Sequence, residues 1–328
     1  MHNHLGPWLA LSTEERKEEQ TVNKSTTPDR AYDVITQRIL DALESGEVPW
    51  RKPWSVQPGL RPQNAISKRP YSGINALILG WSGYTDPRWI TFRAAKANGG
   101  SVRKGEKATP IVFYKRISKP CKPAHPGEIC GHCDIGNPGF KSFGILKYFS
   151  VFNVEQIAGL ELEPIEAPDP AEAPDPIAAA EAIIAGAPNP PSVDHNGGNQ
   201  AYYIPAKDEV HLPPKESFGD AGEYYATVFH ELGHATGHKS RLNRHGLETG
   251  IAPFGSKIYS KEELAAEFAS AFLCNESGIE NTIDNSAAYI AGWARALRQD
   301  KKIVVQAASQ GQKASDYILG AGEGAPDA

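Results

Sequence analysis

The chain has 328 residues, of which 40% are hydrophobic and 22% are charged, and it contains six Trp. This composition excludes a disordered or fibrous protein, and the length allows two domains with separate hydrophobic cores. The four Cys are too few for a disulfide framework, and no apolar segment has the length of a membrane span or the flanks of a signal peptide. We therefore expect a cytoplasmic protein with no membrane contact.

Charge is distributed unevenly along the chain. Residues 29–160 contain 19 Lys and Arg against 10 Asp and Glu, whereas the whole chain has a net charge of −5. The first half is therefore basic and the remainder acidic. A basic region can bind the phosphate backbone of a nucleic acid, because release of counterions favours the complex, although an excess of cations is also common on an ordinary solvated surface.

The N-terminal half predicts a polar arm followed by a mixed α/β domain. Residues 1–28 are polar, and we expect this arm to be disordered. Pro28 suits the first turn of a helix, and apolar residues then recur at helical spacing until Gly46 can end the helix. Runs of β-branched and aromatic residues predict two later strands, at 111–114 and 148–154, in a domain that spans 29–160.

Composition changes after residue 160. Pro, Ala and acidic residues dominate 161–176, where EAPDP occurs twice, and this stretch predicts a semi-stiff linker whose charges repel one another. A second domain is expected at 177–320, ahead of a short tail at 321–328. Within it we predict a helix at 177–186 and a β-hairpin with strands at 201–204 and 209–212.

The most informative motif is HExxH, which contains His230, Glu231 and His234. Asp220 and Glu223 form a capping-box pattern that predicts the start of the helix that carries it. Residues four apart lie on one face of a helix, so both imidazoles can bind one metal ion while Glu231 acts as general base. This pattern is typical of zinc hydrolases.

A catalytic zinc ion has three protein ligands and one open position, so HExxH needs a third ligand from elsewhere. A later histidine is excluded, because Ser240 occupies the position at which metzincins have one. A predicted helix that begins near Ser260 offers Glu262, Glu263 and Glu267. We favour Glu263, with Glu267 four residues later holding the tautomer of a ligand histidine. If Ser260 and Glu263 instead form a capping box, Glu262 or Glu267 is the ligand.

Aromatic and cationic side chains are interleaved in the basic domain. Single-stranded nucleic acid is bound by this combination, because rings stack on bases and cations neutralise phosphates. Ordinary burial of each Trp is the competing explanation. The candidate DNA contacts are Trp50, Arg51, Lys52, Trp54, Arg88, Trp89, Arg93, Lys96, Arg103, Lys104 and Lys107.

A second group of metal-binding residue types lies in a Pro- and Gly-rich stretch of the same domain. Its spacing matches no common zinc finger, so it predicts either a second zinc site of the knuckle type or free thiols on a loop. The candidate ligands are Cys121, Cys130, His132 and Cys133. The fourth cysteine, Cys274, is expected to be a buried small side chain.

Taken together and in this order, the motifs resemble those of the ArdC antirestriction family and of the related N-terminal regions of plasmid TraC-type primases. The resemblance rests on the HELGHATGH run that begins at His230 and on eight further segments. These are 48–54, 71–75, 87–92, 103–110, 152–156, 240–244, 262–267 and 288–320. It implies an α+β fold of two domains, in which a mixed α/β domain that binds single-stranded DNA precedes a zincin-like metallopeptidase domain. It also adds Asn75 to the candidate DNA contacts.

The resemblance further implies a protein of a mobile element that shields incoming DNA from host restriction. We expect a zinc-dependent peptidase, with Mn2+ as another candidate ion, that binds single-stranded DNA and acts on an unknown protein or peptide. The alternative is a DNA-binding protector or a replication accessory protein whose metal site is structural. Both hypotheses need His230 and His234, but only the first needs Glu231.

Overall fold

The computed structural model describes residues 28–51, 54–56, 58–120, 140–165, 175–196, 198–244, 257–283 and 286–321. The predicted arm, the C-terminal tail, most of the acidic linker, Lys52 and the candidate ligands Cys121, Cys130, His132 and Cys133 lie outside these ranges. The chain has an α+β fold of two domains, as predicted. Every helix in the described ranges is too short or too polar to cross a membrane.

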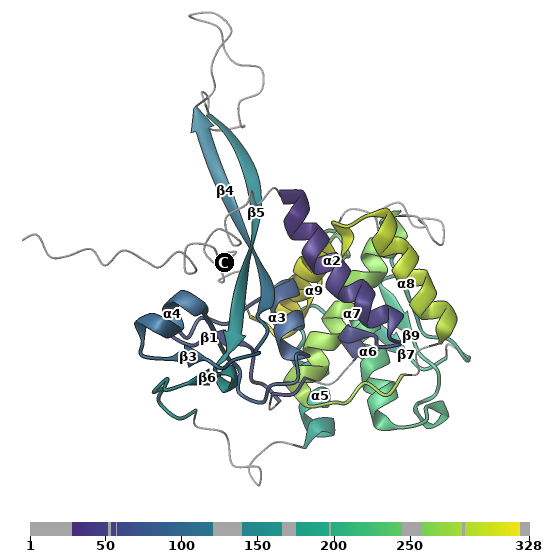
Figure 1. Ribbon diagram of the computed structural model, residues 1–328. Helices are drawn as coiled ribbons and strands as arrows, with labels where there is room; N and C mark the ends of the chain where they lie inside the picture. The colour runs from purple at the N-terminus through teal and green to yellow at the C-terminus, as the bar shows by residue number, and fades with distance from the viewer. Residues whose placement is uncertain are drawn as a thin grey trace, which may run out of the picture.

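The N-terminal domain is built on a four-stranded sheet with the strand order β1-β2-β5-β4 (Figure 1). Strands β4 and β5 continue well beyond their neighbours and project from the body as a two-stranded ribbon. The elements are α2 (Pro28–Glu44), η1 (Pro49–Arg51), β1 (Gln63–Asn64), α3 (Gly73–Gly80), β2 (Arg88–Thr91), α4 (Phe92–Ala97), β3 (Ser101–Val102), β4 (Thr109–Pro120), β5 (Phe140–Asn153), η2 (Val154–Gln156) and β6 (Ile157–Ala158).

Both strands predicted in this domain are present, and both are longer than predicted. Their antiparallel register runs without a break from the pair Thr109 and Val151 to the pair Pro120 and Phe140. Each strand supplies the backbone partners of the other, so pairing continues through residues whose own pattern does not alternate.

The C-terminal domain combines helices with a small sheet of order β7-β9-β8. The predicted helix at 177–186 and the predicted hairpin are confirmed as α5 and as β8 with β9. The elements are α5 (Pro176–Gly186), β7 (Ser192–Asp194), β8 (Tyr202–Ile204), β9 (Glu209–His211), η3 (Lys215–Ser217), α6 (Ala221–Ala235), α7 (Lys257–Ser277), α8 (Ala287–Gln299) and α9 (Ile303–Ile318).

The starts of the two helices that carry the metal-ligand candidates differ in how well the sequence predicts them. Helix α6 starts as predicted, because the Asp220 side chain accepts a hydrogen bond of 2.8 Å from the backbone N–H of Glu223. Helix α7 begins at Lys257, so Ser260 lies within the helix and does not form an N-cap there. The alternative in which a capping box occupies Glu263 therefore does not apply.

The largest hydrophobic core is shared between the two halves of the chain. It combines residues of α2, α3 and the ribbon with residues of α7, α8 and α9. In Figure 1, α2 lies beside α8. A second core lies under α6 and includes residues of α5 and β9. Helix α7 thus contacts both cores and holds the N-terminal domain against the C-terminal one.

Glycines allow α7 to lie very close to the helices on its two sides. A Cβ atom at Gly233 of α6 would stand 3.1 Å from the Cα atom of Ala266. A Cβ atom at Gly311 of α9 would stand 2.6 Å from the Cβ atom of Phe268 and 2.9 Å from the carbonyl oxygen of Ala265. The close contact between α6 and α7 brings the face that carries His230 and His234 towards α7.

We expect Gly311→Ala to lower the free energy of unfolding by about 1–3 kcal/mol, because the added methyl group collides with the backbone of α7. Gly292→Ala is the matched control. Gly292 lies on the exposed face of α8, and a Cβ atom added there meets no atom within 4 Å. This substitution should stabilise the protein by about 0.5–1 kcal/mol through helix propensity. Denaturant unfolding followed by circular dichroism measures both, and equal effects would contradict the packing argument.

Candidate metal centre

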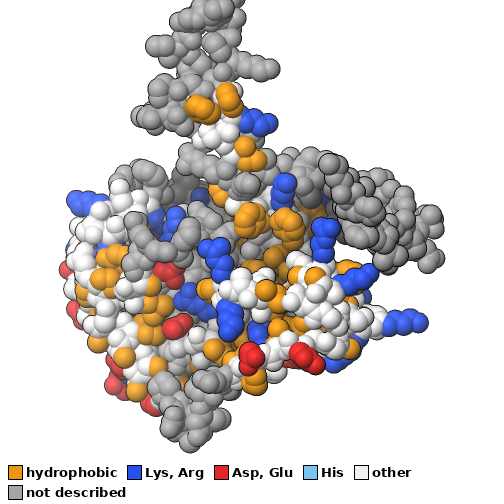
Figure 2. Space-filling model, turned by 90° about the vertical axis from the view of Figure 1, so that its left-hand side faces the viewer, with side chains coloured by type: hydrophobic (Ala, Val, Ile, Leu, Met, Phe, Trp, Pro, Cys, Tyr) orange, Lys and Arg blue, Asp and Glu red, His pale blue; other side chains and the backbone are white. Residues whose placement is uncertain are grey.

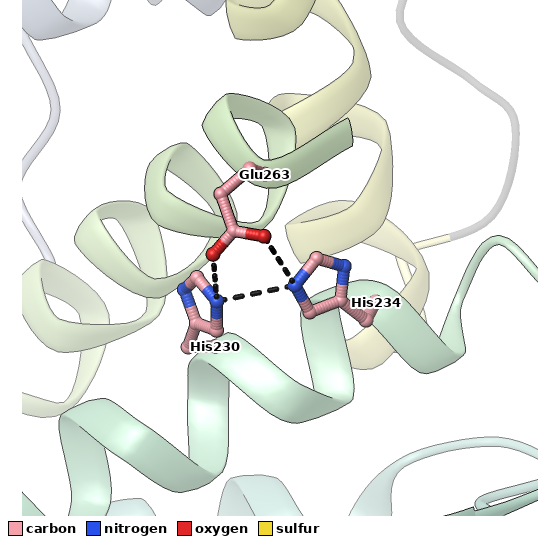
Figure 3. Close-up of side chains that lie close together, drawn as sticks. All are labelled: His230, His234 and Glu263. Carbon is pink, nitrogen blue, oxygen red and sulfur yellow. Dashed lines mark hydrogen bonds and ion pairs between the residues drawn. The ribbon is translucent and has the colours of Figure 1, made fainter. Parts of the chain in front are cut away.

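Three candidate metal ligands converge between α6 and α7 (Figure 3). His230 and His234 project from successive turns of α6, and their Nε2 atoms lie 3.1 Å apart. Glu263 of α7 faces both rings: its Oε1 lies 3.1 Å from Nε2 of His230, and its Oε2 lies 3.5 Å from Nε2 of His234. Two imidazole nitrogens and one carboxylate group therefore surround one point in space.

The spacing of these atoms fits a four-coordinate metal ion. Metal–ligand bonds of about 2.0–2.1 Å at tetrahedral angles place ligand atoms about 3.3–3.4 Å apart. The Nε2–Nε2 separation of 3.1 Å is close to this value, and so are the distances from the two rings to the carboxylate, 3.1 Å to Oε1 and 3.5 Å to Oε2. Two imidazoles and one carboxylate also form a donor set that is known for catalytic zinc. Small shifts of the side chains would suffice to bind an ion.

Glu262 holds the ring of His234 from its outer side. Its Oε1 atom lies 3.6 Å from Nδ1 of His234, so a proton on Nδ1 can point at this carboxylate while Nε2 keeps its lone pair for a metal. Arg244 in turn donates two hydrogen bonds to Glu262 and others to the Thr236 hydroxyl and the Gly233 carbonyl. Sequence reasoning did not assign these roles to Glu262 and Arg244.

The charges around the two histidines favour a bound cation. Burial alone would raise the pKa of Glu263, but contacts with His230 and His234 outweigh burial and lower it. Burial also opposes ionisation of Glu262, yet contacts with His234 and Arg244 lower its pKa to about 2. Both carboxylates are therefore ionised at neutral pH. A divalent cation can replace the positive charge that protons otherwise supply at the imidazoles.

Glu231 lies between the two histidines in the sequence of the motif and is buried, with 6% of its surface exposed. Within the described part of the chain, no side chain forms a hydrogen bond with its carboxylate. An ionisable side chain in this position, one residue from His230, is suited to receive a proton from a water molecule at the site.

Glu267 has a different environment from the one predicted. Instead of a ligand histidine, its carboxylate binds Arg51, with distances of 2.8 Å from Nη2 to Oε1 and 3.3 Å from Nε to Oε2. Tyr289 donates to the same carboxylate at 2.6 Å, and its ring lies 4.1 Å from the Arg51 guanidinium carbon. Glu267 therefore links α7 to η1 and α8, one helical turn from Glu263.

The structure buries several of the predicted DNA contacts. Trp50 packs edge to face against Phe268 and Trp293 and has 2% of its surface exposed. Trp89 has 1% exposed and packs against Tyr84. These two rings have no open face on which a base could stack, because both lie in the hydrophobic core.

Other predicted DNA contacts have partners within the protein. The Asn75 amide donates to the carbonyl of Val112 at 2.6 Å and accepts from its N–H at 2.8 Å, so it joins α3 to β4. Arg51 is paired with Glu267, and Arg88 with Asp86 at 2.6 Å. Trp54 is half-buried, with Gly80 against its ring. The predicted contacts that remain exposed are Arg93, Lys96, Arg103, Lys104 and Lys107.

Each half of the chain matches a known protein family. Residues 29–152 match the N-terminal domain of anti-restriction factor ArdC, and residues 178–310 match a zincin-like metallopeptidase family. The metal-free crystal structure of the antirestriction protein ArdC from plasmid R388 is 35% identical in sequence. The match covers 88% of this chain and 96% of that one, with a TM-score of 0.63. The chain belongs to the ArdC family.

Further relatives support this assignment to the ArdC family. The Mn(II)-bound structure of the R388 protein is also 35% identical, with a TM-score of 0.59 over 88% of this chain and 97% of that one. Two Escherichia coli proteins named DNA primase TraC are each 36% identical over 88% of this chain, which spans 27% and 20% of their lengths. A Sinorhizobium fredii protein, y4eC, is 35% identical over 89% of this chain and 92% of its own length.

Measurements of metal affinity should distinguish the three candidate ligands of α7, Glu262, Glu263 and Glu267. We expect Glu263→Gln to remove most Zn2+ and Mn2+ binding, and Glu262→Gln to weaken it about 10- to 100-fold by releasing the His234 ring. Glu276→Gln, near the far end of the same helix, is the control and should bind like the wild type. Isothermal titration with each metal measures this. Loss of binding in Glu267→Gln but not in Glu263→Gln would reassign the third ligand.

Removal of one partner of the Arg51–Glu267 ion pair should destabilise the protein strongly, because both side chains are at most 10% exposed. We expect Glu267→Gln to cost on the order of 3 kcal/mol, since it leaves the Arg51 charge buried without a counter-charge. Glu44→Gln is the control: its ion pair with Arg298 has side chains that are 55% and 56% exposed, and such pairs contribute about 0–1 kcal/mol. Thermal unfolding that shows equal shifts for both variants would contradict the assignment.

Proposed function

We propose that this member of the ArdC family is an antirestriction protein of a mobile element that binds single-stranded DNA and carries a metal-dependent peptidase site. The observation that carries the proposal is the convergence of His230, His234 and Glu263 beside Glu231. A purely structural ion would need the ligands but would not need an ionisable side chain at position 231. In this proposal the protein acts in the cytoplasm, where incoming DNA meets host restriction.

His230, His234 and Glu263 would hold the metal ion, and we propose Zn2+ as the native one because zinc is the usual ion for two imidazoles and one carboxylate. The Mn(II)-bound structure of the R388 protein supports a divalent ion of either type. When bound, such an ion supplies Lewis acidity toward a carbonyl group and lowers the pKa of water. Glu262 and Arg244 would keep the His234 ring oriented toward it.

The protein's own contribution to peptide hydrolysis would come mainly from Glu231. Its carboxylate would remove a proton from the attacking water and later deliver a proton to the leaving amine nitrogen. Burial of the carboxylate limits its exchange with bulk solvent, and the rigid α6 backbone keeps it at a fixed position relative to the two histidines. The substrate in this proposal is a protein or peptide.

The basic surface of the N-terminal domain supports the DNA-binding part of the proposal. Arg93 and Lys96 lie exposed on α4, and Arg103, Lys104 and Lys107 lie exposed between β3 and β4. Figure 2 shows Lys and Arg side chains gathered in the middle of one face of the molecule, among exposed hydrophobic ones. Such a surface suits a polyanion, because each contact with a phosphate releases counterions. The DNA in this proposal is the single strand that enters a recipient cell.

A variant of the general base tests the peptidase part. We expect Glu231→Gln to retain metal, because all three ligands remain, and to bind single-stranded DNA like the wild type. Its cleavage of an unfolded protein such as casein, in the presence of DNA and Zn2+ or Mn2+, should fall by about 100-fold or more. Glu276→Gln, which alters a half-buried carboxylate near the far end of α7, serves as the control and should retain wild-type cleavage.

Protection of incoming DNA in a restricting host separates the proposal from its alternative. Under the proposal, Glu231→Gln and His230→Ala both lose protection. If Glu231→Gln protects as well as the wild type while His230→Ala fails, the ion is structural and the protein is a non-catalytic protector. Soluble expression and thermal unfolding of each variant show whether a loss merely reflects misfolding.

A further inference from the structure

The β4–β5 ribbon has an unusual composition. The two strands contain 12 and 14 residues, and between them they carry seven Phe and Tyr, five Lys and Arg and no Asp or Glu. A ribbon that only needed to be soluble would carry charges of both signs. Aromatic rings together with cations of a single sign are instead the composition of surfaces that bind single-stranded nucleic acid.

Several rings of the ribbon are exposed rather than packed. Phe113 has 41% of its surface exposed, Phe149 has 46% and Tyr114 has 45%. Exposure of single apolar side chains is common on protein surfaces, but contiguous exposed apolar groups usually mark a binding site. Phe113 and Phe149 are contiguous, because their ring centroids lie 6.3 Å apart in an edge-to-face arrangement.

The strand register places Phe113, Lys147 and Phe149 on one face of the ribbon. Phe113 is paired directly with Lys147, and Phe149 with Ile111, two residues before Phe113. Directly paired residues and residues two apart share a face of an antiparallel pair. Lys147 is exposed, so one cation lies beside the two rings.

The opposite face of the ribbon is partly covered by the body of the protein. Leu146 lies on that face, paired with Tyr114, and is 4% exposed in the core that contains α2. Tyr148 packs against the same core, and the Arg30 guanidinium carbon of α2 lies 5.8 Å from its ring centroid. The face of Phe113, Lys147 and Phe149 is covered only at its base, where Ile111 packs against Leu79 and Trp89, and the side chains of Phe113, Lys147 and Phe149 themselves are exposed.

We propose that this open face is a stacking platform for single-stranded DNA, on which Phe113 and Phe149 contact bases and Lys147 contacts a phosphate. The inference rests on the proposed DNA-binding function and adds a location and a mode of contact. Phenyl rings recognise bases without sequence preference, because every base has a π face. In duplex DNA those faces are stacked on one another, so the platform selects for single strands.

The test uses the full-length protein and a fluorescein-labelled oligothymidylate, with affinity measured by fluorescence anisotropy. We expect Phe113→Ala and Phe149→Ala each to weaken binding about tenfold, since stacking contributes ~1–3 kcal/mol per base. Tyr114→Ala is the matched control, because Tyr114 is equally exposed and lies next to Phe113 but on the opposite face. It should bind within twofold of the wild type.

Two further variants identify the type of contact. Phe149→Trp should retain affinity and Phe149→Leu should lose it, because tryptophan keeps a stacking surface and leucine does not. Lys147→Ala should reduce the slope of log K against log salt concentration by about 0.7, the value for one phosphate contact in a single strand. Binding to a duplex of the same sequence should be insensitive to Phe149→Ala.

The outcomes distinguish failure of this inference from failure of the proposed function. If the wild type does not bind the oligonucleotide, the DNA-binding function itself is wrong. If the wild type binds and the Phe113 and Phe149 variants bind equally well, or if Tyr114→Ala weakens binding as much as they do, the platform is overturned while the function stands. Thermal unfolding confirms that each variant is folded.

Discussion

The close packing of α7 between α6 and α9 is the constraint on which both the metal centre and the junction of the domains depend. A Cβ atom would collide with α7 at Gly311 and would be in tight contact with it at Gly233. One face of α7 directs Glu263 toward the histidines of α6, while Phe268 packs in the core shared with the N-terminal domain. A rigid helix carries both, so a displacement of α7 would alter the ligand geometry and the shared core together.

The two adjacent glutamates of α7, Glu262 and Glu263, point in different directions and contact different residues. Consecutive residues point about 100° apart on a helix, since a turn contains 3.6 residues. Glu263 therefore reaches the Nε2 atoms of both histidines, whereas Glu262 reaches Nδ1 of His234 and is itself held by Arg244. Partial burial of both carboxylates would be costly without these partners, which include both candidate ligand histidines.

The aromatic residues of the N-terminal domain serve two different purposes. Trp50 and Trp89 are buried, where a large ring contributes the most apolar contact area. Phe113 and Phe149 are exposed on the ribbon, where burial cannot explain them. Arg51 likewise belongs to the junction, because its ion pair with Glu267 lies at the contact between η1 and α7. The motif that contains Trp50 and Arg51 is thus a structural link between the domains in this conformation.

The sequence by itself determined the features that depend on neighbours within one or two turns. The cap at Asp220, the hairpin of β8 and β9, and the spacing of His230, Glu231 and His234 are of this kind. Only the tertiary structure decided which glutamate of α7 faces the histidines, that Arg244 supports Glu262, and that Trp50 is buried while Phe113 is exposed. These features join residues far apart in the chain, such as His230 with Glu263 across 33 positions and Arg51 with Glu267 across 216. Local periodicity carries no information about such contacts, because helix packing and strand pairing fix them only when the chain is folded.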